Sequence, residues 1–137
     1  MIVLVDTDVL LDVALERSDH VKASAELLDA LQNEPGTGLV VWHTLANFYY
    51  MTRGSLGDSK ARAFLKDLLA FLRVAPTRTE DALRAANLAF SDFEDALQAA
   101  AAMAGGADVI ATRNLRDYKA SPVPALSPQA VLKKLKS

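Results

Sequence analysis

The sequence predicts one α/β domain over residues 1–137, with a central parallel sheet of about four to five short strands flanked by helices. Two observations predict this fold class. Short apolar runs of strand length alternate along the chain with longer segments whose apolar residues have helical spacing. Polar residues directly follow several of these runs, and because crossover helices pair strands in parallel, we expect the polar clusters at one edge of the sheet.

Length and composition narrow the possible functions. The chain has 137 residues, 51% of them hydrophobic, which suits a single buried core. A net charge of −2 and a pI near 5.6 exclude the strongly basic composition typical of duplex-binding proteins. Cys is absent, so oxygen atoms or the two His residues must bind any metal, which favours hard cations. The N-terminal apolar run is too short for a signal peptide or a membrane span, so we expect a cytoplasmic protein without membrane association.

The first strand is expected at residues 2–5, where four consecutive apolar residues indicate burial on both faces of a sheet. Asp6 follows at the strand end, where open α/β sheets bind ligands, and is therefore a candidate site residue. The alternative is that Asp6 or Asp8 only caps the next helix. We expect Asp6 to contact a metal and Asp8 to cap the helix and support the site. Asp12, one turn beyond Asp8, need not reach the site.

A pair of helices is expected before the second strand, which we place at residues 38–42. Thr44 is the expected N-cap of the helix that follows this strand, and Asn47 lies three residues on. Residues 73–75 are expected to form a short edge strand, because Pro76 cannot donate a hydrogen bond to a sheet. Polar side chains thus follow the second strand as they follow the first.

Two near-identical segments, residues 80–83 and 94–97, each open an Ala-rich helix. Acidic residues in a first turn complement the helix dipole, so Asp92 and Asp95 have a purely structural interpretation. Only the second of these helices leads into a further strand. That difference makes Asp95 the stronger candidate for a functional role.

The strand after the second Ala-rich helix is expected at residues 107–111, and the polar segment 112–117 follows it. Residues 122–126 are expected to form a last, short edge strand. A helix capped by Ser127, with Pro at its first position, ends the chain. The strand at 107–111 therefore brings a third polar cluster to the same edge of the sheet.

Carboxylates that converge at one edge would repel each other and raise each other's pKa, and a divalent cation removes that conflict. Mg²⁺ or Mn²⁺ suits all-oxygen ligation and usually takes one or two direct carboxylates while retaining water. Such an ion favours the hydrolysis of phosphodiesters. The candidate residues are Asp6, Asp8, Asn47, Asp92, Glu94, Asp95, Asn114 and Asp117.

The sequence resembles the PIN-domain family, and within it the VapC-type toxins of bacterial toxin–antitoxin pairs. The matching segments are residues 5–12, 92–97 and 106–118, and the last two in this order are the specific ones. The resemblance implies a PIN-like fold and a Mg²⁺- or Mn²⁺-dependent endoribonuclease with RNA as its substrate. It also implies a homodimer and inhibition by a cognate antitoxin protein.

The resemblance also implies roles for individual residues. Asp6 matches the first metal carboxylate of the family, and Asp95 matches the acid that opens the late helix. Asp92 is close enough in sequence to share that metal-binding role. Asp117 matches a late acidic position, which makes Asp6, Asp95 and Asp117 the expected catalytic residues and all four the expected metal ligands.

Four further residues are expected to support the site: Asp8, Asn47, Thr112 and Asn114. Thr112 matches a hydroxyl that supports the first carboxylate. Asn47 departs from the family pattern, which usually has Glu on the helix after the second strand. The amide keeps an oxygen acceptor but removes one negative charge, so we expect weaker metal binding.

Two alternatives remain open on the sequence. Residues 3–10 also fit the Asp-x-Asp opening of haloacid-dehalogenase-like phosphatases, although residues 111–114 replace the late acidic pair that such enzymes need. The second alternative is a degenerate PIN domain that binds RNA or a protein partner with weak or no catalysis. The Asn47 departure favours this second alternative.

Overall fold

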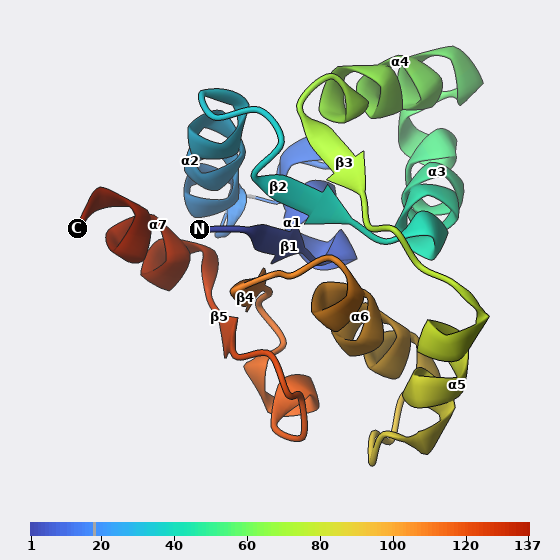
Figure 1. The fold of residues 1–137 in the computed structure, drawn as a ribbon. Helices are drawn as coiled ribbons and strands as arrows, with labels where there is room; N and C mark the ends of the chain where they lie inside the picture. The colour runs from blue at the N-terminus through green and yellow to red at the C-terminus, as the bar shows by residue number, and fades with distance from the viewer. Residues whose placement is uncertain (18) are drawn as a thin grey trace.

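A parallel sheet of five strands forms the centre of the computed structural model, which describes residues 1–17 and 19–137 (Figure 1). The strand order is β3-β2-β1-β4-β5, and every neighbouring pair is parallel. The predicted fold class is confirmed. The strands are β1 (Val3–Val5), β2 (Gly38–Val40), β3 (Leu72–Val74), β4 (Val109–Ala111) and β5 (Ala125–Leu126).

Helices cover both faces of this sheet (Figure 1). One face packs against α1 to α4 and α7, and the other packs against α6, which α5 contacts in turn. The helices are α1 (Thr7–Ala14), α2 (Val21–Gln32), α3 (Trp42–Leu56), α4 (Asp58–Leu69), α5 (Thr79–Asn87), α6 (Phe93–Ala104) and α7 (Pro128–Lys136), with a 3₁₀ turn η1 (Leu115–Tyr118) before β5. In the described part of the chain, no helix is long and apolar enough to cross a membrane.

The central strand β1 is buried on both faces, as its unbroken apolar run predicts. Val3, Leu4 and Val5 have no solvent exposure. Val3 and Val5 belong to the apolar cluster formed with α1 to α4 and α7, whereas Leu4 belongs to the cluster formed with α6. Successive side chains of a strand point to opposite faces, so this division follows from the strand geometry. Asp6 is therefore the first residue after β1 that lies outside the two apolar clusters.

Helix α6 brings acidic residues to the carboxyl edge of the sheet. It leads directly into β4, which is parallel to β1, so α6 must begin at the edge where the strands end. Its four consecutive alanines at residues 99–102 are all buried, and these small side chains let the helix lie close to the sheet. Gly106, with φ of +68°, ends the helix in a left-handed conformation that favours glycine. The acidic first turn of α6 consequently lies near Asp6.

Helix α3 begins three residues earlier than the sequence predicts. Strand β2 ends at Val40, Val41 is the N-cap residue, and Trp42 is the first helical residue. The prediction that Thr44 caps the helix is wrong, because the chain turns into α3 immediately after the strand. Thr44 is instead buried in the first turn, where its hydroxyl lies 3.2 Å from that of Thr7.

An ion pair between Asp12 and Arg113 fastens the segment after β4 to α1. The Asp12 carboxylate is fully buried and accepts two hydrogen bonds from the Arg113 guanidinium, at 2.7 and 3.0 Å. It also accepts a hydrogen bond from the Ser24 hydroxyl at 3.1 Å. Asp12 thus stays outside the candidate site, as expected, but it holds a residue that borders the site.

We expect Asp12→Ala to lower the free energy of unfolding by about 3 kcal/mol, because it leaves a largely buried guanidinium without its partner. This is the low end of the range, since the Arg113 side chain is 26% exposed. The matched control is Asp58→Ala, which removes the exposed partner of Arg62 and should change stability little. Urea unfolding of both variants measures the difference, and equal losses would contradict the prediction.

Candidate active site

The Asp6 carboxylate is the centre of the candidate site. It is only 7% exposed, and each of its oxygens accepts two hydrogen bonds. Oδ1 accepts from the Thr7 backbone N–H at 2.8 Å and from Gln98 Nε2 at 3.2 Å. Oδ2 accepts from the Thr112 hydroxyl at 2.8 Å and from the Tyr118 hydroxyl at 3.1 Å. Burial raises the pKa of Asp6, and the hydrogen bonds from Thr112, Thr7 and Tyr118 oppose that rise.

Asp95, in the first turn of α6, shares the Tyr118 hydroxyl with Asp6. The hydroxyl oxygen lies 3.1 Å from Asp6 Oδ2 and 3.4 Å from Asp95 Oδ1. A phenol has one proton to donate, so it can satisfy only one of the two carboxylates fully at a time. Burial and the charges of Asp92, Asp6 and Asp117 raise the pKa of Asp95 to about 6. Burial and the negative charges of Asp6 and Asp95 raise the pKa of the Tyr118 hydroxyl.

Asp92 and Asp117 lie at the outer side of this pair. Asp92 is exposed and caps α6, because its carboxylate accepts a hydrogen bond from the Asp95 backbone N–H at 3.1 Å. Asp117 is exposed on η1. The charges of both residues act on Asp95, but neither residue hydrogen-bonds to Asp6 in the described part of the chain. Asp92 therefore has a structural role as the cap of α6, whether or not it also binds a metal.

The prediction that Asp8 caps α1 is wrong. The helix begins at Thr7, directly after the strand, so Asp6 occupies the N-cap position and bonds the Thr7 N–H itself. Asp8 instead accepts a hydrogen bond from the Arg113 backbone N–H at 2.9 Å, and its Oδ2 lies 3.4 Å from the Thr112 hydroxyl. Burial and the charge of Asp6 raise the pKa of Asp8 to about 6.

A cavity of about 400 Å³ opens over these carboxylates and contains Asn47 and Asn114 in its wall. Asn47 Nδ2 donates a hydrogen bond to Glu94 Oε2 at 3.1 Å, between α3 and α6. The Asn114 backbone N–H donates to the Thr112 hydroxyl at 3.0 Å. The family resemblance leads us to expect a carboxylate of α3 at this place. Instead, the amide of Asn47 contacts the Glu94 carboxylate of α6.

Sequence reasoning missed Gln98 and Tyr118 as site residues, and it named Glu94 as a candidate without a specific role. Gln98 was detectable as the polar residue of an otherwise apolar helix segment, three residues after Asp95 and hence on the same face. It is 2% exposed and also donates to the Thr44 hydroxyl at 3.1 Å. Tyr118 carried no such signal, because an aromatic residue after a loop is ordinarily part of the core.

The residues present fit a hydrated, hard divalent cation. Among residues 1–17 and 19–137, no three Asp, Glu or His side chains form a ready-made metal cage. Mg²⁺, however, needs only one or two carboxylates and keeps several waters. All the candidate ligands are oxygen atoms, and two buried oxygens at the cavity, Asp8 Oδ1 and Gln98 Oε1, lack a hydrogen-bond partner within the described residues. Asp6 and Asp95 are the residues that could hold such an ion.

Comparisons with known proteins identify a family. A family model described as PIN domain matches residues 2–116. No curated protein matches the sequence. The fold is similar to a crystal structure of VapBC2 from Rickettsia felis bound to a DNA fragment from its promoter, with a TM-score of 0.72, 18% identity, and coverage of 93% of this chain and 98% of that one.

Two further solved structures share the fold. DNA-bound VapBC from Salmonella typhimurium matches with a TM-score of 0.70 and 17% identity, over 93% of this chain and 98% of that one. VapC20 from Mycobacterium tuberculosis, described as a Sarcin-Ricin loop cleaving toxin, matches with a TM-score of 0.63 and 16% identity, over 79% of this chain and 86% of that one.

The raised pKa values of Asp8 and Asp95, both about 6, predict how stability depends on pH. An unfolded Asp titrates near 3.9, so between about 4 and 6 the folded state binds more protons than the unfolded state. The contribution of these two groups to the free energy of unfolding is therefore present at low pH and is lost as the pH rises through 6. We expect Asp95→Asn to flatten this dependence in the metal-free protein.

Urea unfolding at a series of pH values, with chelator, measures the effect. Comparing variants is necessary because the lowered pKa of His43 contributes with the opposite sign in the same range. The control is Asp67→Asn, which changes an exposed carboxylate of α4 and should keep the wild-type dependence. If the free energy of unfolding of Asp95→Asn depends on pH as that of the wild type does, the prediction is contradicted.

Proposed function

The chain belongs to the PIN-domain family, and from this premise we propose that it is a divalent-metal-dependent endoribonuclease, the toxin of a toxin–antitoxin pair. The observation that carries the proposal is the meeting of Asp6 and Asp95 at the Tyr118 hydroxyl, beside a cavity at the carboxyl edge of the sheet. The similar fold of VapC20, described as a Sarcin-Ricin loop cleaving toxin, supports RNA as the substrate.

In this proposal Asp6 and Asp95 hold Mg²⁺ or Mn²⁺, and Asp92 and Asp117 add negative charge around them. When bound, the ion would lower the pKa of a water molecule and neutralise charge that develops on the phosphodiester. The protein's own contribution is to fix the Asp6 carboxylate. Four hydrogen bonds from Thr7, Gln98, Thr112 and Tyr118 hold it in one orientation.

The hydrolysis itself consumes one water molecule. The water oxygen forms a bond to phosphorus, the bond from phosphorus to one ester oxygen breaks, and that oxygen leaves as a hydroxyl after taking up a proton. The products are a phosphomonoester and a free hydroxyl on the two RNA fragments. The half-exposed Asp95 lies at the open side of the carboxylate pair, where substrate can approach.

A degenerate PIN domain that binds RNA without efficient cleavage is the second candidate function. The presence of Asn47 where a carboxylate is expected favours it, whereas the nearby Glu94 carboxylate favours retained activity. The phosphatase alternative has no support, because the PIN-domain match spans residues 2–116 and Thr112-Arg113-Asn114 follows β4 in place of an acidic pair.

We also propose a cognate antitoxin protein and a homodimer as partners. The VapBC complexes among the similar structures support an antitoxin. Tyr50 and Met51 of α3 are 64% and 54% exposed, and such apolar side chains suit a surface shared between two copies. Light scattering of the purified chain tests the dimer.

Cleavage of RNA by the purified protein tests the enzyme. We expect cleavage in Mg²⁺ or Mn²⁺ and none in chelator. Asp6→Asn and Asp95→Asn should each lower the rate by about 100-fold or more, because they weaken the binding of a group that supplies several kcal/mol of transition-state stabilisation. The control Asp67→Asn should retain the wild-type rate. Cleavage that survives Asp6→Asn or persists in chelator would overturn the proposal, and binding without cleavage would select the degenerate domain.

The hydrogen bond between Asn47 and Glu94 predicts metal affinities that calorimetric titration with Mn²⁺ can measure. Asn47→Glu should bind Mn²⁺ more tightly than the wild type, because it adds a carboxylate to the cavity. Glu94→Gln should bind about tenfold more weakly, as expected for loss of a supporting carboxylate. The exchange variant Asn47→Glu/Glu94→Gln keeps one amide and one carboxylate in contact and should resemble the wild type.

The control for Glu94→Gln is Glu80→Gln, at the equivalent position in the similar opening of α5. Its Mn²⁺ affinity should equal that of the wild type. Unchanged affinity in both Asn47→Glu and Glu94→Gln would show that this pair has no part in metal binding.

A further inference from the structure

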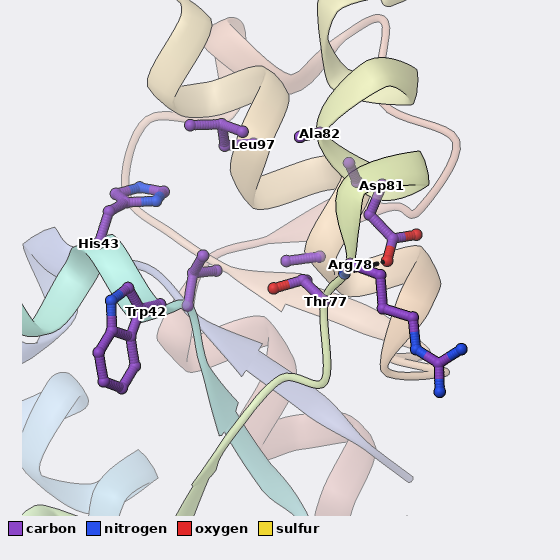
Figure 2. A pocket seen from close by; sticks show the side chains of 10 residues that line it. Trp42, His43, Thr77, Arg78, Asp81, Ala82 and Leu97 are labelled. Atoms are coloured by element: carbon purple, nitrogen blue, oxygen red, sulfur yellow. Dashed lines mark hydrogen bonds between the residues drawn. The ribbon is translucent and has the colours of Figure 1, made fainter.

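A second, smaller cavity lies beside the carboxylate cluster, between the start of α3 and helices α5 and α6 (Figure 2). Its volume is about 180 Å³. This is less than the roughly 300–1,000 Å³ of pockets that enclose a whole small ligand, so the cavity suits a single ring system. Its walls include Trp42, His43, Arg78, Asp81, Leu97 and Ala101.

The walls combine an aromatic ring, the Arg78 cation, the Asp81 carboxylate and an apolar floor. Trp42 is 72% exposed at the first position of α3, and Leu97 and Ala101 of α6 lie at the inner side of the cavity. Arg78 is the N-cap residue of α5 and lies on the side of the cavity opposite Trp42, with its guanidinium pointing outward (Figure 2). In the described part of the chain, this guanidinium forms no ion pair.

His43 connects this cavity to the carboxylate cluster. Its ring borders the cavity, and the negative charges of Glu94 and Asp6, which line the larger cavity, act on it. The cavity therefore lies next to the place where a phosphodiester would be cleaved. Leu97 lines this cavity, and the next residue of α6, Gln98, lines the larger cavity over the carboxylates, so the two cavities adjoin along α6.

Resting on the proposed ribonuclease function, we propose that this cavity binds one nucleobase of single-stranded RNA beside the scissile phosphodiester, with the base stacked on Trp42 and Arg78 contacting a backbone phosphate. Single-stranded nucleic acids are bound in this way, by aromatic rings that stack on bases and by cations that follow the backbone. The exposure of Trp42, the Arg78 cation at the opposite wall and the position of the cavity beside the carboxylate cluster are the observations that favour RNA as the occupant.

Trp42 is the single tryptophan of the chain, so its fluorescence reports on this cavity alone. We expect saturable quenching when a short single-stranded RNA of mixed sequence is added to the wild-type protein in chelator, where no cleavage is expected. The same titration of Asp6→Asn in Mg²⁺ is a second measurement under conditions that include the metal. Both should give a binding curve.

The anisotropy of the same RNA, labelled with fluorescein, measures the affinity of variants. Trp42→Ala and Arg78→Ala should each weaken binding by about fivefold or more, the lower end of what one stacked base contributes. Trp42→Phe keeps a flat ring and should lose less. The matched controls are Leu83→Ala, which removes an exposed apolar side chain of α5, and Arg84→Ala, which removes a cation of α5; neither residue lines the cavity.

The outcomes separate this proposal from the ribonuclease function. If the wild type cleaves RNA, but RNA does not quench Trp42 and Trp42→Ala binds RNA with full affinity, the base-binding site is overturned. The ribonuclease function is then retained. If RNA quenches Trp42 in the wild type and Trp42→Ala binds RNA more weakly, but no RNA is cleaved, the base-binding site is supported and the ribonuclease function is overturned. Trp42 emission that changes with protein concentration, without RNA, would show that a second copy or another protein covers the cavity and would overturn the proposal.

Discussion

The buried carboxylate of Asp6 is the constraint on which the rest of the site depends. A charge removed from water is costly unless hydrogen bonds replace the lost hydration. Here the donors come from four parts of the chain: the backbone of Thr7, the α6 residue Gln98, Thr112 after β4 and Tyr118 on η1. The parallel sheet brings these parts together, because β1 and β4 end at the same edge and α6 begins there. Satisfying Asp6 thus fixes the relative positions of all of them.

Asp6 therefore fills two roles that the sequence presents as alternatives. A cap and a site residue are separate interpretations of an Asp after a strand, yet Asp6 caps α1 and is also the most connected carboxylate of the site. The reason is that α1 starts without an intervening loop. This leaves Asp8 to fix the segment after β4 through the Arg113 backbone, while Asp12 fixes the Arg113 side chain. Asp6, Asp8 and Asp12 thus lie within seven residues, and each makes a different set of structural contacts.

The resemblance to the family implies a carboxylate of α3 at the position of Asn47. The Asn47 amide contacts Glu94 on α6, so a carboxylate still lies at that side of the cavity. Asp95 shares its neighbourhood with Asp92 and Asp117, and mutual repulsion contributes to its raised pKa. A cluster that is unfavourable without a counter-ion is the expected state of a site that binds a divalent cation.

The sequence alone determined the fold class, the PIN-domain family and the residues that follow each strand, because these depend on local periodicity and on contiguous motifs. It placed the polar clusters that contain Asp6 and Thr112 at one edge, because crossover helices pair the strands in parallel. Only the tertiary structure decided which side chains touch. Gln98 and Tyr118 lie 92 and 112 residues from Asp6 in the chain, and no pattern of spacing encodes a hydrogen bond over that separation. The start of α3 at Trp42 was likewise decided by packing, which buries Thr44 against α1 and α6 instead of leaving it as a cap.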